Sequence, residues 1–136
     1  MGFDKLASPL AGIPVLRRTL DAFLAAESIA EVVVVCPEER WNLLGDGFSK
    51  PVTRVDGGAN RQDSVAAGLA ALSATAHLVA VHDGARPMIS PADIDRSVAA
   101  AGPHRAAALA RRVTETLKLS DTADFSAEAV SREQLW

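Results

Sequence analysis

The chain of 136 residues has one cysteine, few aromatic residues and no long hydrophobic run. Because Cys36 is the only cysteine, an intrachain disulfide and a cysteine-rich zinc site are excluded, and a reducing, cytoplasmic setting is favoured. The apolar runs fall far short of the roughly 18 residues that a membrane span needs. Residues 1–9 also lack the charged and apolar regions of a targeting peptide. We therefore predict a soluble cytoplasmic protein with no membrane partner.

The charge is nearly balanced. Fourteen Lys and Arg residues against seventeen Asp and Glu residues give a net charge of −3, and the basic residues are scattered. This pattern excludes the basic patch that is typical of nucleic-acid-binding domains, so we predict no nucleic-acid partner. The length and the hydrophobic content of 49% suit one globular domain that folds without disulfides. An anionic ligand must then be bound by a few local residues.

Hydrophobic periodicity predicts alternating helices and strands. The expected helices are residues 14–26, 38–44, 61–72 and 91–101, and the expected strands are residues 31–36, 52–55, 77–81 and 105–111. The connections are too long for hairpins, which predicts an α/β fold with a mostly parallel sheet flanked by helices on both faces. In such folds ligands bind at the carboxyl ends of the strands.

The two ends of the chain depart from this alternation. Residues 113–119 alternate apolar and polar side chains and residues 120–128 are rich in turn formers, which predicts a protruding β-arm over residues 113–130. A doubly wound sheet normally begins with a strand and a glycine-rich turn, and neither precedes the helix expected at residue 14. Residues 131–136 resemble the start of a helix. We expect one domain over residues 1–136 that is incomplete at both ends.

Two loops combine unusual residues with strand ends. Residues 56–65 follow a strand and open a helix, and the paired glycines there let the backbone approach a planar or phosphorylated ligand. An ordinary turn explains this loop equally well. In residues 81–87, Asp83 suits a divalent metal or a ribose hydroxyl and Arg86 suits a phosphate, although a simple turn explains the loop better in isolation. His82 is expected to pack or to form hydrogen bonds rather than to act as a base.

Two other groups are ambiguous. Taken alone, Lys5 near the N-terminus is better explained as a solvated surface lysine. A solvated surface explains the arm residues Thr116, Lys118 and Arg132 as well as a binding role does.

Taken in order, these segments resemble the 2-C-methyl-D-erythritol 4-phosphate cytidylyltransferase family. The resemblance covers the whole chain, although family members are longer. The matching segments are the Asp-Gly-Gly at 56–58 with Arg61 and Ser64, Val-His-Asp-Gly-Ala-Arg-Pro at 81–87, Val-Thr-Glu-Thr-Leu-Lys at 113–118, Arg132 with Leu-Trp at 135–136, and Lys5 before Pro-Val-Leu at 14–16.

The resemblance implies an enzyme with a Rossmann-like fold of the glycosyltransferase-A type. It would join CTP to 2-C-methyl-D-erythritol 4-phosphate, giving 4-diphosphocytidyl-2-C-methyl-D-erythritol and pyrophosphate in non-mevalonate isoprenoid biosynthesis. Mg²⁺ would be the cofactor, and the arm would form a homodimer. Since the attacking group in the family is the substrate phosphate, catalysis would depend on positioning and charge neutralisation.

The resemblance also implies roles for single residues. Lys5 would be catalytic, stabilising the charge that builds on the α-phosphate. The residues implied for CTP are Gly58, Arg61, Ser64, Asp83 and Gly84, with Asp83 also at the metal. The residues implied for methylerythritol phosphate are Asp83, Arg86, Thr116 and Arg132, the last two reaching across the dimer.

Some departures and alternatives remain open. Ala59 stands where the family often has an acid, and the family's glycine-rich loop and C-terminal acid and lysine have no counterpart in this sequence. We therefore expect the 136 residues by themselves to be inactive. A cytidylyltransferase of the ribitol 5-phosphate type and a non-catalytic, dimerising relic of the fold are the alternatives. A fusion to a downstream cyclase domain is also compatible with the sequence.

Overall fold

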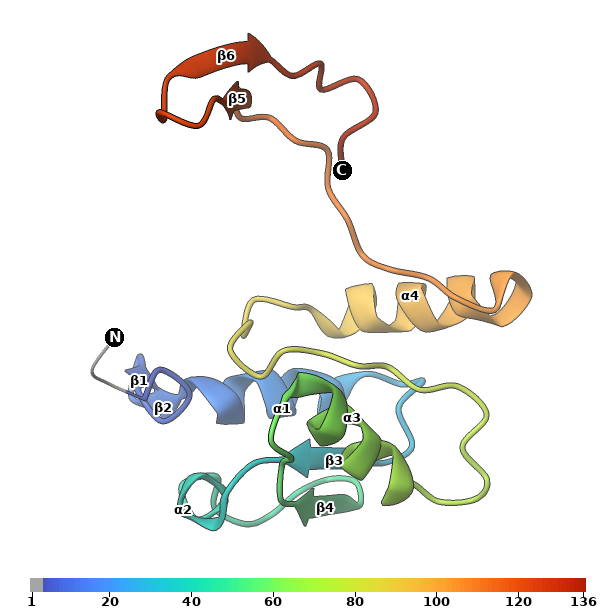
Figure 1. The fold of residues 1–136 in the computed structure, drawn as a ribbon. Coiled ribbons are helices and arrows are strands. Elements are labelled where there is room, and N and C mark those ends of the chain that lie inside the picture. The colour runs from blue at the N-terminus through green and yellow to red at the C-terminus, as the bar shows by residue number, and fades with distance from the viewer. Residues whose placement is uncertain (1–3) are drawn as a thin grey trace.

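The structure is a computed structural model that describes residues 4–136. Its elements in chain order are β1 (Pro9–Leu10), β2 (Ile13–Pro14), α1 (Val15–Ala25), β3 (Val32–Val35), α2 (Glu38–Trp41), β4 (Val52–Val55), α3 (Arg61–Ala70), α4 (Pro91–His104), β5 (Lys118–Ser120) and β6 (Ser126–Ala129). A layered body holds the elements from β1 to α4, and an arm carrying β5 and β6 extends from it (Figure 1). Within residues 4–136, no helix is long and apolar enough to cross a membrane.

Strand β3 lies at the centre of the body. It pairs in parallel with β4, with Val32 opposite Val52 and Val35 opposite Val55. Its four consecutive valines favour the extended state because their branched side chains pack well on a pleated surface. Alternate side chains of a strand point to opposite faces, so β3 can pack against a helix on each side.

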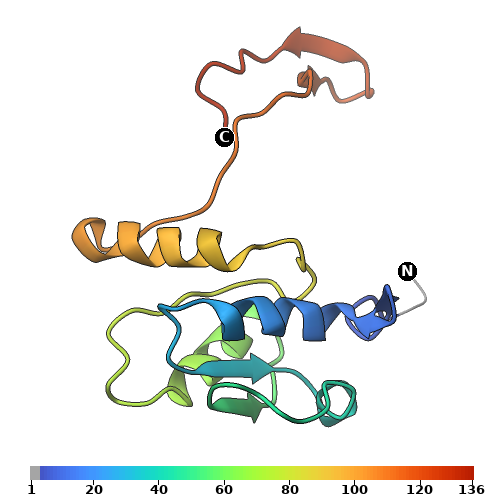
Figure 2. The ribbon, with the colours of Figure 1, turned by 180° about the vertical axis from the view of Figure 1, so that it is seen from behind.

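The two faces of β3 are covered by different helices. On one face, Val34 joins a buried cluster with three leucines of α1, namely Leu16, Leu20 and Leu24. On the other face, α3 approaches so closely at Gly68 that a Cβ atom there would lie 3.0 Å from Val35 Cγ2. In Figure 1 α3 passes in front of β3, and in Figure 2, seen from behind, α3 lies behind α1 and β3. The predicted α/β arrangement with helices on both faces is therefore present at this strand pair.

Polar caps place the starts of two helices where the sequence predicts them. The Asn60 side chain accepts a hydrogen bond from the Asp63 backbone N–H at 2.9 Å, and α3 begins at Arg61. Ser90 caps α4 in the same way and Pro91 occupies its first turn. The predicted end of α4 at residue 101 is wrong, because the helix continues through Pro103 to His104 and ends where Arg105 takes a left-handed conformation with φ of 67°.

The strands predicted at residues 77–81 and 105–111 are wrong. Neither segment pairs with another strand among residues 4–136, and Leu78, Val79 and Val81 are exposed. A run of β-branched residues becomes a strand only when a neighbouring backbone completes its hydrogen bonds. The parallel sheet is thus limited to β3 and β4 in the described part of the chain.

The arm is built on an antiparallel hairpin. Strand β5 pairs with β6, with Lys118 opposite Ala129, and the register shifts between Leu119 and Ser120. The Val113 N–H donates to the Leu135 carbonyl at 3.1 Å, so the beginning of the arm is tied to the end of the chain. The helix start predicted at residues 131–136 is wrong, because this segment forms a turn in which the Leu135 N–H donates to the Arg132 carbonyl.

Candidate active site

The N-terminal segment and the loop at residues 82–86 meet around a hollow of about 450 Å³. Its lining residues are Lys5, Leu6, Asp83, Gly84, Ala85 and Arg86. The structure therefore brings the expected catalytic lysine next to the residues expected to contact metal and acceptor, although they lie far apart in the sequence. Two cationic side chains and one carboxylate face this hollow, which suits an anionic ligand.

Asp83 joins the two loops that the sequence singles out. Arg61, the first residue of α3, donates from Nη1 to Asp83 Oδ1 at 2.7 Å, and Arg86 donates from Nε to Oδ2 at 3.1 Å. The hydrogen bond and charge of Arg61, assisted by Arg86, hold the pKa of Asp83 below its usual value. Both guanidinium groups remain open to solvent, with side-chain exposures of 71% and 75%. Exposed ion pairs contribute little to stability, so Arg61 and Arg86 can leave the Asp83 carboxylate and bind a phosphate ligand at little cost.

The loop at residues 56–65 folds onto the first turn of α3. The Gly58 N–H donates to Ser64 Oγ at 3.0 Å, and the Ser64 hydroxyl donates to the Asn60 carbonyl at 2.9 Å. A Cβ atom at position 58 would lie 2.2 Å from the Cβ of Asp63, so no side chain fits there. The close approach explains the glycine, and Ser64 has a loop-fastening role that the sequence pattern did not reveal.

Two residues that sequence reasoning did not single out anchor the turn that carries Lys5. Asp4 accepts hydrogen bonds from the Leu6 N–H at 3.0 Å and from Arg40 Nε at 2.6 Å. The hydrogen bond from Arg40, on α2, lowers the pKa of Asp4. The Leu16 N–H at the start of α1 also donates to the Leu6 carbonyl at 3.1 Å. An aspartate that bonds the backbone two residues on is a recognisable turn signal, but its partner Arg40 is visible only in the fold.

The loop at residues 82–86 rests on α1. His82 lies with its ring centroid 5.2 Å from that of Phe23, and its Nε2 is 3.1 Å from the Arg86 carbonyl oxygen. This is the packing and hydrogen-bonding role that the sequence predicts for His82. The Thr19 hydroxyl lies 2.8 Å from the Gly84 carbonyl oxygen, a contact that sequence reasoning missed because the two residues belong to separate motifs.

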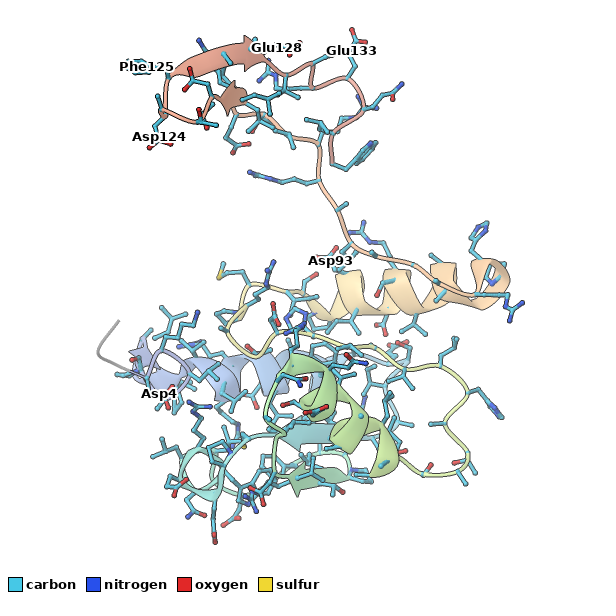
Figure 3. All side chains as sticks on the ribbon, in the orientation of Figure 1. Asp4, Asp93, Asp124, Phe125, Glu128 and Glu133 are labelled. Atoms are coloured by element: carbon cyan, nitrogen blue, oxygen red, sulfur yellow. The ribbon has the colours of Figure 1, made fainter. Side chains whose placement is uncertain are left out.

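The remaining two predicted site residues, Thr116 and Arg132, lie on the arm and away from the hollow. Arg132 Nη1 donates to the carbonyl oxygens of Thr114 and Glu115, the latter at 3.3 Å. Figure 3 shows Asp4, the neighbour of Lys5, in the body, whereas Asp124 and Glu128 mark the far end of the arm. Within one chain, these arm residues are not brought to Lys5 and Asp83.

The described residues offer little for a metal ion on their own. Among residues 4–136, no three His, Cys, Asp or Glu side chains lie close enough together to hold one. Mg²⁺ is commonly bound through one or two carboxylates together with phosphate oxygens and water. Asp83 therefore fits a magnesium ion whose other ligands come from a bound phosphate chain and from solvent.

Comparisons with known proteins agree along the whole chain. The family model for 2-C-methyl-D-erythritol 4-phosphate cytidylyltransferase matches residues 1–136. The protein of that name from Pelotomaculum thermopropionicum is 44% identical over 133 residues, which are 93% of this chain and 56% of the relative.

Solved structures show the same likeness. The 4-diphosphocytidyl-2C-methyl-D-erythritol synthase of Anaerococcus prevotii superposes with a TM-score of 0.80 at 25% identity, over 96% of this chain and 61% of the other. The 2-C-methyl-D-erythritol 4-phosphate cytidylyltransferase of Thermus thermophilus gives a TM-score of 0.75 at 34% identity, over 95% and 59%. The chain thus spans between 56% and 61% of the length of these proteins. Since the family model matches the chain from its first described loop to its last residue, the chain belongs to the 2-C-methyl-D-erythritol 4-phosphate cytidylyltransferase family.

Proposed function

We propose that the protein transfers a cytidylyl group from CTP to 2-C-methyl-D-erythritol 4-phosphate, releasing pyrophosphate. The observation that carries the proposal is the hollow in which Lys5 stands beside Asp83 and Arg86, with Arg61 bonded to the same carboxylate. A Rossmann-like sheet of the glycosyltransferase-A type is part of the proposal and is supported by the parallel pair β3–β4 with a helix on either face. A cytoplasmic location is also part of it, because the single cysteine, Cys36, is free and buried.

The chemistry needs positioning and positive charge more than it needs a base. An oxygen of the methylerythritol phosphate attacks the α-phosphorus of CTP, and the bond from that phosphorus to the bridging oxygen breaks as pyrophosphate leaves. The attacking phosphate is already anionic at neutral pH, so no residue has to remove a proton from it. Lys5 neutralises the charge that builds on the α-phosphate, while Arg61 and Arg86 hold phosphate oxygens. His82, engaged with Phe23 and the Arg86 carbonyl, is not required as a base.

The loop at residues 58–64 suits cytosine better than uracil. The Ser64 hydroxyl donates its only proton to the Asn60 carbonyl. Its oxygen can therefore only accept a hydrogen bond from a bound nucleobase. Cytosine presents an amino group that donates, whereas uracil presents a carbonyl that accepts.

Magnesium fits this site through Asp83. Asp83 would hold the ion, which would offset the negative charge of the triphosphate. For Asp83 to reach it, Arg61 and Arg86 must turn from the carboxylate to the phosphates, and their exposed positions allow that exchange.

The acceptor distinguishes this function from that of a ribitol 5-phosphate cytidylyltransferase. In the protein at its natural length, we expect pyrophosphate release from CTP with methylerythritol phosphate to exceed that with ribitol 5-phosphate by about 10-fold or more in kcat/KM, because ribitol 5-phosphate has a longer, unbranched carbon chain and one more hydroxyl group. Turnover is followed as pyrophosphate. A preference for ribitol 5-phosphate would favour the other acceptor, and CTP binding with no turnover on either would indicate a non-catalytic relic.

We also propose that the arm at residues 113–130 pairs with a second copy and places Thr116 and Arg132 over the partner's hollow. The arm exposes Leu117, Leu119 and Phe125, the last at 72%, and has no core of its own beneath its two strands. A two-stranded hairpin is only marginally stable in isolation, so we expect a partner surface to cover these side chains. The separation of the arm from the body in Figure 1 leaves both faces of the hairpin accessible to one.

Subunit mixing tests this sharing of residues. Lys5→Ala and Arg132→Ala variants should each be weakly active, and an exchanged mixture of the two should recover about a quarter of wild-type activity. Half of the exchanged dimers are heterodimers, and one of their two sites holds both native groups. Each variant exchanged with itself serves as the control. An inactive mixture, with heterodimers shown by mass spectrometry, would place Arg132 in its own subunit or outside the reaction.

A further inference from the structure

We propose that Thr19, on the buried face of α1, is a positioning residue that sets where Asp83 stands by holding the Gly84 carbonyl. The inference rests on the proposed function, which places Asp83 at the CTP and metal site. Thr19 touches neither ligand and acts through the backbone of the loop at residues 82–86.

Thr19 is unusual in its surroundings. It is 5% exposed and is the single polar residue among the buried ones in the described part of the chain. Its Oγ1 lies 2.8 Å from the Gly84 carbonyl oxygen and 3.2 Å from the Val15 carbonyl oxygen. A hydroxyl has one proton, and a helical threonine commonly donates it to the carbonyl four residues back. The shorter distance shows that the better bond here leads out of the helix to Gly84.

The same face of α1 holds the loop at two further points. A Cβ atom at Gly84 would lie 2.7 Å from Leu16 Cδ1, so the loop backbone rests directly on the helix. Phe23 packs against His82 with the two rings tilted and their centroids 5.2 Å apart. Leu16, Thr19 and Phe23 follow one another at intervals of three and four residues, which places them along one side of a helix.

These contacts bracket Asp83. Its neighbours His82 and Gly84 are both fastened to α1, while its carboxylate lies between Arg61 and Arg86. Leu16 and Phe23 hold the loop through van der Waals packing, which depends little on direction. The Thr19 hydroxyl instead forms a directional hydrogen bond to the loop. Losing that bond should let Asp83 shift within the hollow, and a displacement of about 1 Å can cost on the order of 100-fold in rate.

The test uses the protein at its natural length and compares Thr19→Val, which keeps the shape and removes the donor, with Thr19→Ser, which keeps the donor. We expect Thr19→Val to lower kcat by about 10- to 100-fold with a smaller change in KM for CTP. Thr19→Ser should restore most of the rate. Leu20→Val, a change in the buried core of the same helix, is the matched packing control and should leave kcat near wild type.

A second measurement does not depend on turnover. The pKa of Asp83, followed by ¹³C NMR of its carboxyl group, should rise toward the ordinary aspartate value in Thr19→Val, because Arg61 no longer pairs with it as closely. It should stay low in Thr19→Ser and in Leu20→Val. If valine at position 19 prevents folding, Thr19→Ala is measured in its place, with the same expected results.

The outcomes separate this inference from the proposed function. An unchanged kcat and an unchanged Asp83 titration in Thr19→Val would overturn the positioning role, and so would a Leu20→Val variant that reproduces both effects. A wild-type protein that does not turn over CTP with methylerythritol phosphate would overturn the proposed function, while the Asp83 titration would still decide whether Thr19 positions this carboxylate.

Discussion

Replacing Lys5 by alanine in the protein at its natural length is expected to lower kcat by about 100-fold or more, the effect of removing one preorganised charge-stabilising group. The affinity for CTP should change much less. The reason is that the ammonium group meets its greatest charge in the transition state, when negative charge accumulates on the α-phosphate, and not in the ground state.

The structure supports this expectation because the turn that carries Lys5 is anchored to the body. Its neighbour Asp4 accepts hydrogen bonds from Arg40 and from the Leu6 N–H. An anchored backbone limits how far the Lys5 ammonium has to move to meet the developing charge, and electrostatic stabilisation is largest where little rearrangement is needed.

Steady-state kinetics with CTP and methylerythritol phosphate, together with CTP binding by calorimetry, separate the two effects. Lys5→Arg keeps the charge and should retain part of the rate. Arg96→Ala removes an exposed cation on α4, away from the hollow, and should be close to wild type. An Lys5→Ala variant with weakened CTP binding and normal turnover would return Lys5 to the role of a solvated surface lysine.

Asp83→Asn is expected to lower kcat by on the order of 100-fold and to raise the Mg²⁺ concentration needed for half-maximal activity. Asparagine keeps the shape of the side chain but loses the charge that pairs with Arg61 and Arg86 and that would bind the metal. The melting temperature should hardly change, because both ion pairs are largely open to solvent.

The effect also has a defined pH range. The pKa of Asp83 is lowered by Arg61, so the carboxylate and its ion pairs persist at every pH above the ordinary aspartate pKa of about 3.9 and are lost only as the pH falls below it. The ratio of wild-type to variant activity should therefore stay constant from weakly acidic to alkaline pH. The activities of wild type and Asp83→Asn are measured against the Mg²⁺ concentration at several pH values. Asp46→Asn, which changes an exposed aspartate in the turn after Leu44, is the control. Full activity with an unchanged magnesium requirement would exclude Asp83 from the metal site.

The features that the sequence predicted well depend on near neighbours. Residues within one turn of each other were enough to predict the strand at residues 52–55, the starts of α3 and α4, and the loop between strand and helix at residues 56–60. Asn60 caps the helix that directly follows it, and Gly58 faces Asp63 five residues later. Local sterics and backbone hydrogen bonds control these features, so a short window of sequence contains their cause.

The features that only the tertiary structure decided depend on residues far apart in the chain. Residues 77–81 have the composition of a strand, yet they pair with nothing among residues 4–136, because a strand needs a second backbone beside it. The same holds for the site: Lys5 and Asp83 line one hollow only because α1 holds the N-terminal turn and the loop at residues 82–86 together. Thr19 looks like an ordinary helical residue until the Gly84 carbonyl comes within 2.8 Å of its hydroxyl. Periodicity within a segment determines which residues can pack inward, but the packing of distant segments determines which polar groups meet.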